Sequence, residues 1–159
     1  MRHRTTPASR LPFFLLGLVL SAAVLAADRS SREPRFTDAG SQAAEFIGYS
    51  SSIRLTQAQQ KQRDRALEKI PAPCCSKFSS RTCCCPCNLA KSVWGLSNFV
   101  IARQGGGDAE LERAVRAWIR FVNPGGFSGT TCDTAGGCGR RFSQNGCGGM
   151  NERVLEAAR

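Results

Sequence analysis

Two stretches of the chain carry apolar residues at helical spacing after a clear start. Residues 56–59 form a capping-box pattern, which predicts a helix from Thr56 to about Lys69, where prolines 71 and 73 follow. The second stretch has apolar residues at positions 89, 93, 96 and 100 and predicts a central helix that ends at the glycines 105–107. The second helix begins either with Pro86 as its first residue and Cys85 as cap, or with Asn88 as cap.

A third stretch, residues 108–122, combines an apolar face with a row of arginines at 113, 116 and 120. We interpret this row as a solvated face rather than as a binding site, because charged rows on helices most often face water. No convincing run of alternating strand residues appears. The pattern therefore predicts an all-α fold, a small three-helix domain over residues 56–122 with cysteine-rich loops.

The flanks of this domain have a different character. Residues 1–26 have a basic start, an apolar run and small residues at the end, which is typical of a Sec-type signal peptide; an uncleaved membrane anchor is the alternative. We interpret most of residues 27–55 as a flexible tether, rich in Ser, Arg and Gly, with a short helix near residues 42–46 as an open alternative. Residues 123–159 form a Gly- and Cys-rich C-terminal segment, which we expect to be held by disulfides or metal.

The predicted signal peptide determines the compartment in which the rest of the chain folds. An exported protein matures in the bacterial periplasm or at the cell surface, where disulfides persist. The formal net charge is +10, and 19 basic residues stand against 12 acidic ones after residue 26. Because no dense basic run with interleaved aromatic residues is present, we expect no nucleic-acid partner, and membrane contact only through the N-terminal segment.

The cysteines carry the candidate chemistry. Six of the nine lie within residues 74–87, a density that no hydrophobic core requires. The single histidine is His3, so a metal site in the mature chain would be built mainly from sulfur. Thiolates select soft ions, and we expect Zn or Cu(I). The candidate ligands are Cys74, Cys75, Cys83, Cys84, Cys85, Cys87, Cys132, Cys138 and Cys147.

Two alternatives remain open beside this soft-metal hypothesis. One is thiol–disulfide chemistry, in which Cys84 and Cys87 of a C-x-P-C motif would be catalytic, at a helix start that favours thiolate. The other is a disulfide-stapled interaction module without chemistry. The absence of a histidine after the leader excludes Cys–His and Ser–His nucleophiles, so we favour a protein that is not an enzyme. A partner would be a metal-handling or thiol-bearing protein.

The order of helix, cysteine motif, apolar helix and amphipathic helix over residues 56–122 resembles two families. One is the periplasmic thiol domain of cytochrome c maturation H-type proteins, which carries Cys-x-x-Cys between helices and acts on apocytochrome thiols; it would correspond to Cys84 and Cys87. The other comprises exported bacterial proteins named for a Pro-Cys-Tyr-Cys-Gly-Cys motif and regarded as metal-binding, which implies Cys83, Cys85 and Cys87. This chain departs from both with Cys-Cys-Cys-Pro-Cys.

Overall fold

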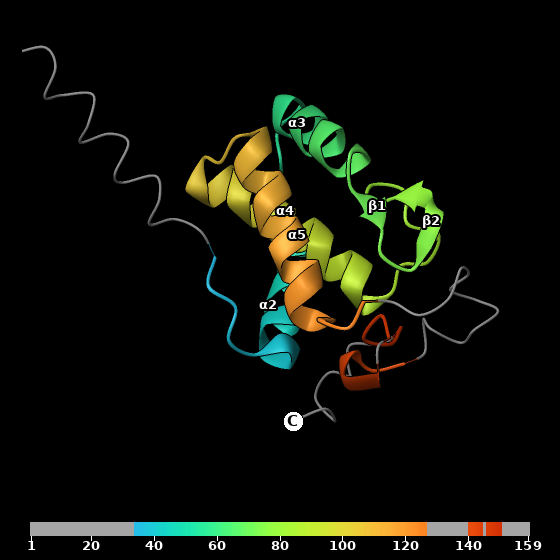
Figure 1. The fold of residues 1–159 in the computed structure, drawn as a ribbon. Coiled ribbons are helices and arrows are strands. Elements are labelled where there is room, and N and C mark those ends of the chain that lie inside the picture. The colour runs from blue at the N-terminus through green and yellow to red at the C-terminus, as the bar shows by residue number, and fades with distance from the viewer. Residues whose placement is uncertain (1–33, 127–139, 145, 151–159) are drawn as a thin grey trace, which may run out of the picture. The chain divides into compact units, whose positions relative to one another are not determined.

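A computed structural model describes residues 34–126, 140–144 and 146–150 of the 159-residue chain. Within these residues the fold is mostly helical, with four α-helices and one two-stranded hairpin (Figure 1). The expected all-α class is therefore confirmed only in its coarse form. The predicted signal peptide lies outside the described residues, and no helix within them is long and apolar enough to cross a bilayer.

Helix α3, Gln57–Glu68, forms where its capping box predicts. The Thr56 side chain accepts a hydrogen bond from the Gln59 backbone N–H, and the Gln59 side chain accepts one from the Thr56 N–H. These two bonds satisfy amides that the first turn leaves without helical partners. The helix contributes Ala66 and Leu67 to the core.

Helix α4, Asn88–Gln104, is central, as its apolar pattern predicts. It packs against α2, α3 and α5, and residues on several of its sides are buried. Gly105 ends the helix in the left-handed region at φ 64°, where a residue without Cβ is not strained. The start differs from both expectations, because Cys87 is the N-cap and Asn88 is the first helical residue.

Helix α5, Asp108–Val122, places its predicted apolar face on the core. Leu111, Val115, Trp118 and Val122 are buried. The indole N–H of Trp118 donates to the hydroxyl of Ser92 on α4 at 2.8 Å, which gives this fully buried ring a partner for its polar edge.

Helix α2, Ala39–Ser52, occupies a stretch that we expected to be a flexible tether. Asp38 caps its start by accepting from the Ser41 backbone N–H. Phe46 is 4% exposed and meets Trp118 edge to face, with ring centroids 5.0 Å apart. The stretch is folded because this aromatic contact buries apolar surface, although its composition is polar enough to suggest a linker.

The α2–α4 contact depends on one glycine. A Cβ at Gly95 of α4 would lie 1.6 Å from the carbonyl oxygen of Phe46 on α2. The two helix backbones therefore approach more closely than any side chain at this position would permit. Such a contact joins residues about 50 positions apart in sequence, which explains why local patterns did not reveal it.

A short hairpin was not expected. Strand β1, Pro71–Ala72, pairs in an antiparallel manner with β2, Cys75–Ser79, with an irregular register. Pro71 and Pro73 stop α3 as predicted and direct the chain into extended backbone. The hairpin is too short to show an alternating sequence pattern, and it carries Cys74 and Cys75.

The α2–α4 packing yields a prediction about stability. We expect Gly95→Ala to lower the free energy of unfolding by about 3 kcal/mol or more, because the methyl group would overlap the α2 backbone, which cannot move aside as a flexible side chain can. Chemical denaturation followed by far-UV circular dichroism measures this change.

Gly48→Ala on α2 is the matched control. A Cβ at Gly48 would meet nothing within 4 Å. We expect this substitution to leave stability unchanged or raise it by up to about 1 kcal/mol, through helix propensity. Equal effects of the two substitutions would contradict the close-approach interpretation.

Candidate functional site

The cysteines of residues 74–87 lie on three consecutive pieces of backbone. Cys74 and Cys75 belong to the hairpin, Cys83 to Cys85 to the loop after β2, and Cys87 to the start of α4. The loop is fixed at its beginning by Ser80, whose N–H donates to the Ile70 carbonyl at 2.7 Å and whose carbonyl accepts from the Trp94 indole at 2.9 Å. The hairpin and α4 therefore hold this cysteine loop from both sides.

The C-terminal segment supplies the missing cap of α4. Cys87 makes no side-chain cap, and the amides of the first helical turn bond instead to carbonyls about 60 residues later. The Asn88 N–H donates to Gly149 at 2.8 Å and the Leu89 N–H to Cys147 at 2.9 Å. The Asn88 side-chain amide donates to the Gly148 carbonyl at 2.8 Å. These bonds bring Cys147 beside Cys87.

Two glycines make this cap possible. Gly148 and Gly149 have φ values of 77° and 82°, in the region that favours glycine. At Gly148, a Cβ would also lie 2.4 Å from the ring of Phe142. The tail therefore needs glycine here for two separate reasons, the backbone conformation and the contact with Phe142.

Cys83, Cys87 and Cys147 form a linked row of thiols, which we call the thiol row. All three are free, and Cys87 and Cys147 are fully buried. Hydrogen bonding to Cys87, together with burial, raises the pKa of Cys83 well above its ordinary value. Hydrogen bonding to Cys147 raises the pKa of Cys87 to about 12. Cys83 and Cys87 are consequently protonated at neutral pH.

The start of α4 lowers the pKa of Cys87, but this effect is smaller than the opposite effect of Cys147. The Ala90 backbone N–H donates to the Cys87 sulfur and lowers its pKa, as expected at a helix N-terminus. The neighbouring Cys147 thiol has the larger, opposite effect. The thiolate that the sequence predicted at this position is therefore disfavoured by adjacent sulfur.

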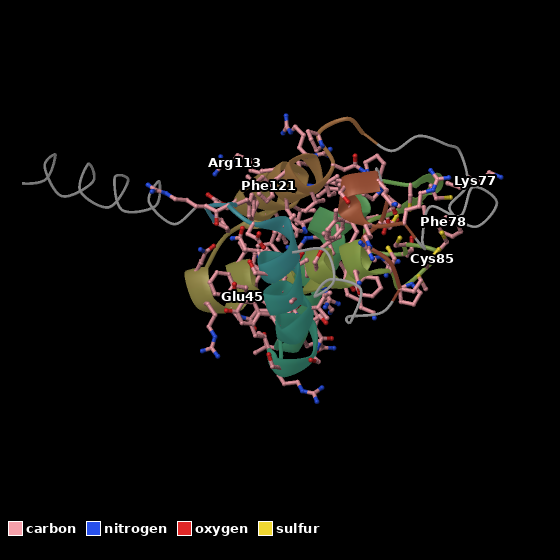
Figure 2. All side chains as sticks on the ribbon, turned by 90° about the horizontal axis from the view of Figure 1, so that it is seen from below. Glu45, Lys77, Phe78, Cys85, Arg113 and Phe121 are labelled. Carbon is pink, nitrogen blue, oxygen red and sulfur yellow. The ribbon has the colours of Figure 1, made fainter. Side chains whose placement is uncertain are left out.

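Cys84 and Cys85 form a second pair at the surface. Their sulfur atoms lie 3.3 Å apart, and Cys84 is exposed. Two effects raise the pKa of Cys84 to about 12. The larger is the partial desolvation of its sulfur, and the smaller is the hydrogen bond with Cys85. Figure 2 shows Cys85 at the same end of the molecule as the exposed Phe78 and Lys77.

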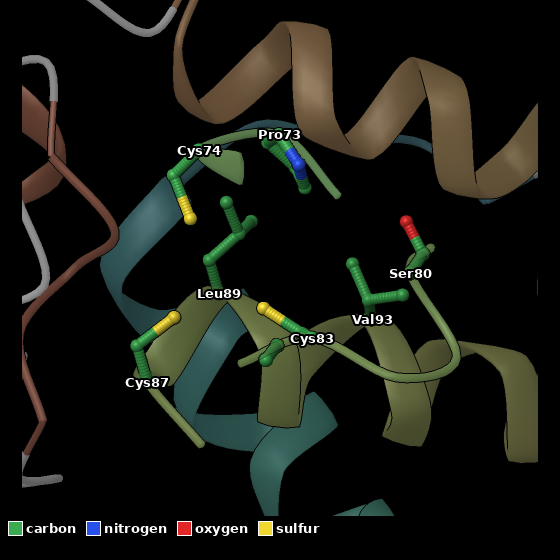
Figure 3. Close-up of a pocket in the computed structure, with 8 residues that line it drawn as sticks. Pro73, Cys74, Ser80, Cys83, Cys87, Leu89 and Val93 are labelled. Atoms are coloured by element: carbon green, nitrogen blue, oxygen red, sulfur yellow. The ribbon is translucent and has the colours of Figure 1, made fainter. Parts of the chain in front are cut away.

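A small cavity lies between the hairpin, the loop and α4. It has a volume of about 10 Å³, comparable to one water-sized sphere, and Cys74, Cys83 and Cys87 line it together with Leu89 and Val93. Figure 3 shows the sulfur atoms of these three cysteines turned toward one another across this space. The cavity could admit no organic ligand; only a single atom or ion is small enough.

The structure brings together only some of the predicted residues. It links Cys87 to Cys83 and to Cys147, and it links Cys84 to Cys83 and to Cys85. Cys75 is buried on the hairpin and lies near Cys84. Cys132 and Cys138 lie outside the described residues. No group of three or more cysteine, histidine or acidic side chains in the described part of the chain is already arranged to hold a metal ion.

Sequence reasoning missed the residues that position the thiol row. These are Asn88, Gly148 and Gly149, which make the backbone cap. The adjacent glycines after Cys147 were a usable signal, because a pair of left-handed residues suits backbone that turns its carbonyls to a partner. No family model, curated protein or solved structure matches this chain, so the site is interpreted from its own geometry.

The tail cap yields a second prediction. In Gly148→Ala, the methyl group would meet Phe142 and the backbone would be strained at φ 77°, so we expect the tail to leave α4. Cys147, which is 0% exposed, should then react with an alkylating reagent at least about tenfold faster under native conditions. Mass spectrometry of tryptic peptides measures this rate.

Gly126→Ala is the control for strain alone. Gly126 has a similar φ of 73°, but a Cβ there would meet nothing within 4 Å. Alkylation of Cys147 should remain slow in this variant. Rapid alkylation in both variants, or in neither, would contradict the assigned role of the Gly148 contact.

Proposed function

We propose that this chain binds one soft metal ion, Cu(I) or Zn, through the thiolates of Cys83, Cys87 and Cys147. The observation that carries the proposal is the meeting of three free thiols from three separate segments at the start of α4. Cys83 comes from the loop after β2, Cys87 is the N-cap residue of α4, and Cys147 belongs to the C-terminal segment. Soft sulfur ligands favour Cu(I), Zn and similar ions over hard cations.

Electrostatics support a cation in this place. Cys87 raises the pKa of Cys83, and Cys147 raises the pKa of Cys87, because hydrogen bonding to a neighbouring thiol and burial disfavour the thiolate. A bound cation offsets that effect and allows the thiols to lose their protons. The Ala90 N–H on Cys87 and the N-terminal end of α4 favour the negative charge of the resulting thiolates.

The local backbone permits the adjustment that binding requires. Cys87 and Cys147 are fixed by α4 and its cap, whereas Cys83 lies in a loop and is only half buried. A small movement of this loop would close the row around an ion. Cys84 and Cys85, on the same loop, are the nearest source of a fourth ligand for tetrahedral Zn.

The redox alternative has less support. A dithiol couple needs two sulfurs within bonding reach and a fraction of thiolate, yet Cys84 and Cys87 are linked only through Cys83, and both have raised pKa values. A purely stapled module also has less support, because Cys74 is disulfide-bonded but the six other described cysteines are not. Export and a metal-handling partner remain proposals that rest on the leader and the cysteines.

Metal retention by single variants tests the proposal. The full chain is reduced, loaded anaerobically with Cu(I) or Zn, desalted and measured by elemental mass spectrometry. We expect one ion per chain, and in Cys87→Ser or Cys147→Ser at least about a 100-fold loss of affinity in chelator competition, because a ligand is removed.

Cys75→Ser is the matched control, since Cys75 is also a buried free thiol but lies outside the thiol row. We expect its metal affinity to stay within about twofold of the parent. An unloaded reduced protein, or equal losses in Cys75→Ser and Cys87→Ser, would overturn the proposal.

Proton release provides an independent measurement. Because Cys83 and Cys87 have raised pKa values, they hold their protons at neutral pH and must release them to an incoming ion. We expect roughly two to three protons per ion between pH 6 and 8, and an apparent affinity that rises with pH by the same number of logarithmic units. Calorimetry in buffers of different ionisation enthalpy measures the release, and a value near zero would contradict thiolate ligation.

A further inference from the structure

A second candidate site lies where the start of the hairpin faces α5. An open groove of about 470 Å³ runs between the α3–β1 junction and the C-terminal turns of α5. One wall is apolar, built from Ile70, Pro71 and Pro73, and Ile119 and Pro124 continue it on the α5 side. The groove contains no cysteine, so it is separate from the proposed metal site.

The polar side of the groove is a stripe on α5. Arg116, Arg120 and Asn123 lie at positions i, i+4 and i+7, so that they follow one face of the helix. The Arg116 guanidinium donates to the Lys69 carbonyl at 3.0 Å, which holds it across the groove. Neither arginine forms an ion pair with a carboxylate in the part of the chain that the structure describes.

Asn123 provides the decisive observation. Its side chain is 3% exposed, yet neither its amide nitrogen nor its carbonyl oxygen has a hydrogen-bond partner among the described residues. A buried polar group without a partner loses its bonds to water and receives nothing in return. An amide at the edge of a groove can recover both bonds from a ligand that offers one donor and one acceptor.

We propose that this groove binds the C-terminal residue of a peptide that ends in an aliphatic side chain. The carboxylate accepts from the guanidinium groups of Arg116 and Arg120, whose two full charges outweigh the partial negative charge at the end of α5. The amide group of the peptide pairs with Asn123. Its aliphatic side chain packs against Ile70, Pro71 and Pro124, which the groove supplies beside its charged stripe.

All three arginines of the row are exposed, as the interpretation of a solvated face expects, and the proposal adds a ligand for two of them. Arg113 is the exception, because it does not line the groove and lies beside Glu110 at 3.9 Å. Figure 2 shows Arg113, like Phe121 of the same helix, away from the labelled Cys85 of the cysteine loop. Arg113 therefore supplies a matched control on the same helix.

N-acetyl-leucine and its uncharged counterpart N-acetyl-leucinamide are the probes. Each is titrated into the reduced full chain, with binding followed by NMR at the Asn123 side-chain amide and the arginine Nε–H groups. We expect N-acetyl-leucine to bind with a dissociation constant on the order of 1 mM, and the amide to bind at least about tenfold more weakly, because it lacks the carboxylate.

Three variants separate this site from general attraction of anions to a basic surface. Arg120→Gln should weaken binding at least about fivefold, and Arg113→Gln by less than about twofold. Asn123→Leu should abolish binding while raising the melting temperature of the unliganded protein, since it removes an unpartnered amide.

Equal binding of both probes would overturn the proposal, as would equal losses in Arg113→Gln and Arg120→Gln. Failure of N-acetyl-leucine to bind the parent chain would also overturn it. None of these outcomes depends on metal loading, so the test is independent of the proposed metal site.

Discussion

The start of helix α4 is the constraint on which the rest of the structure depends. Its first amides point at no side chain, and the carbonyls of Cys147 and Gly149 take that role. A helix start without partners would leave buried donors unsatisfied, so the distant tail is required there for reasons of hydrogen bonding alone. Cys87 is the N-cap residue of the same turn, so the hydrogen bond from the Leu89 N–H to the Cys147 carbonyl also brings Cys147 close to Cys87.

Helix α4 also connects the cysteine loop to the hydrophobic core through hydrogen bonds and packing contacts. Ser92, one turn into α4, accepts from the Trp118 indole, and the Trp94 indole donates to the Ser80 carbonyl in the loop that carries Cys83. Further along, Gly95 allows α2 to approach and lets Phe46 reach Trp118. The cysteine loop is therefore attached to the central, most extensively packed helix of the fold, and sites built on regular elements hold ligand geometry more precisely than sites on loops.

Helix starts and stops could be predicted from the sequence, whereas contacts between residues far apart in the chain could not. The Thr56–Gln59 capping box and the stop at Gly105 are set by a few adjacent residues, so their positions could be predicted. Helix α2 depends on a contact between Phe46 and Gly95, and the cap of α4 depends on Gly149. Neither contact leaves a periodic pattern. For the candidate site, the cysteine cluster indicated sulfur chemistry, but which thiols meet is decided by the tail.

The two proposed sites differ in how their buried polar groups are paired. In the thiol row, neutral thiols satisfy one another, and raised pKa values keep the charge away until a cation arrives. In the groove, the Asn123 side-chain amide has no partner and neither guanidinium group pairs with a carboxylate among the described residues, so the polarity is left open for a ligand. The first arrangement couples binding to proton loss and to the attachment of the tail, because an ion held by Cys87 and Cys147 also holds the cap of α4 in place. The second couples binding to recognition of shape and charge, with little change of the fold. If both proposals hold, the chain binds metal at the start of α4 and a peptide terminus between the α3–β1 junction and the last turns of α5.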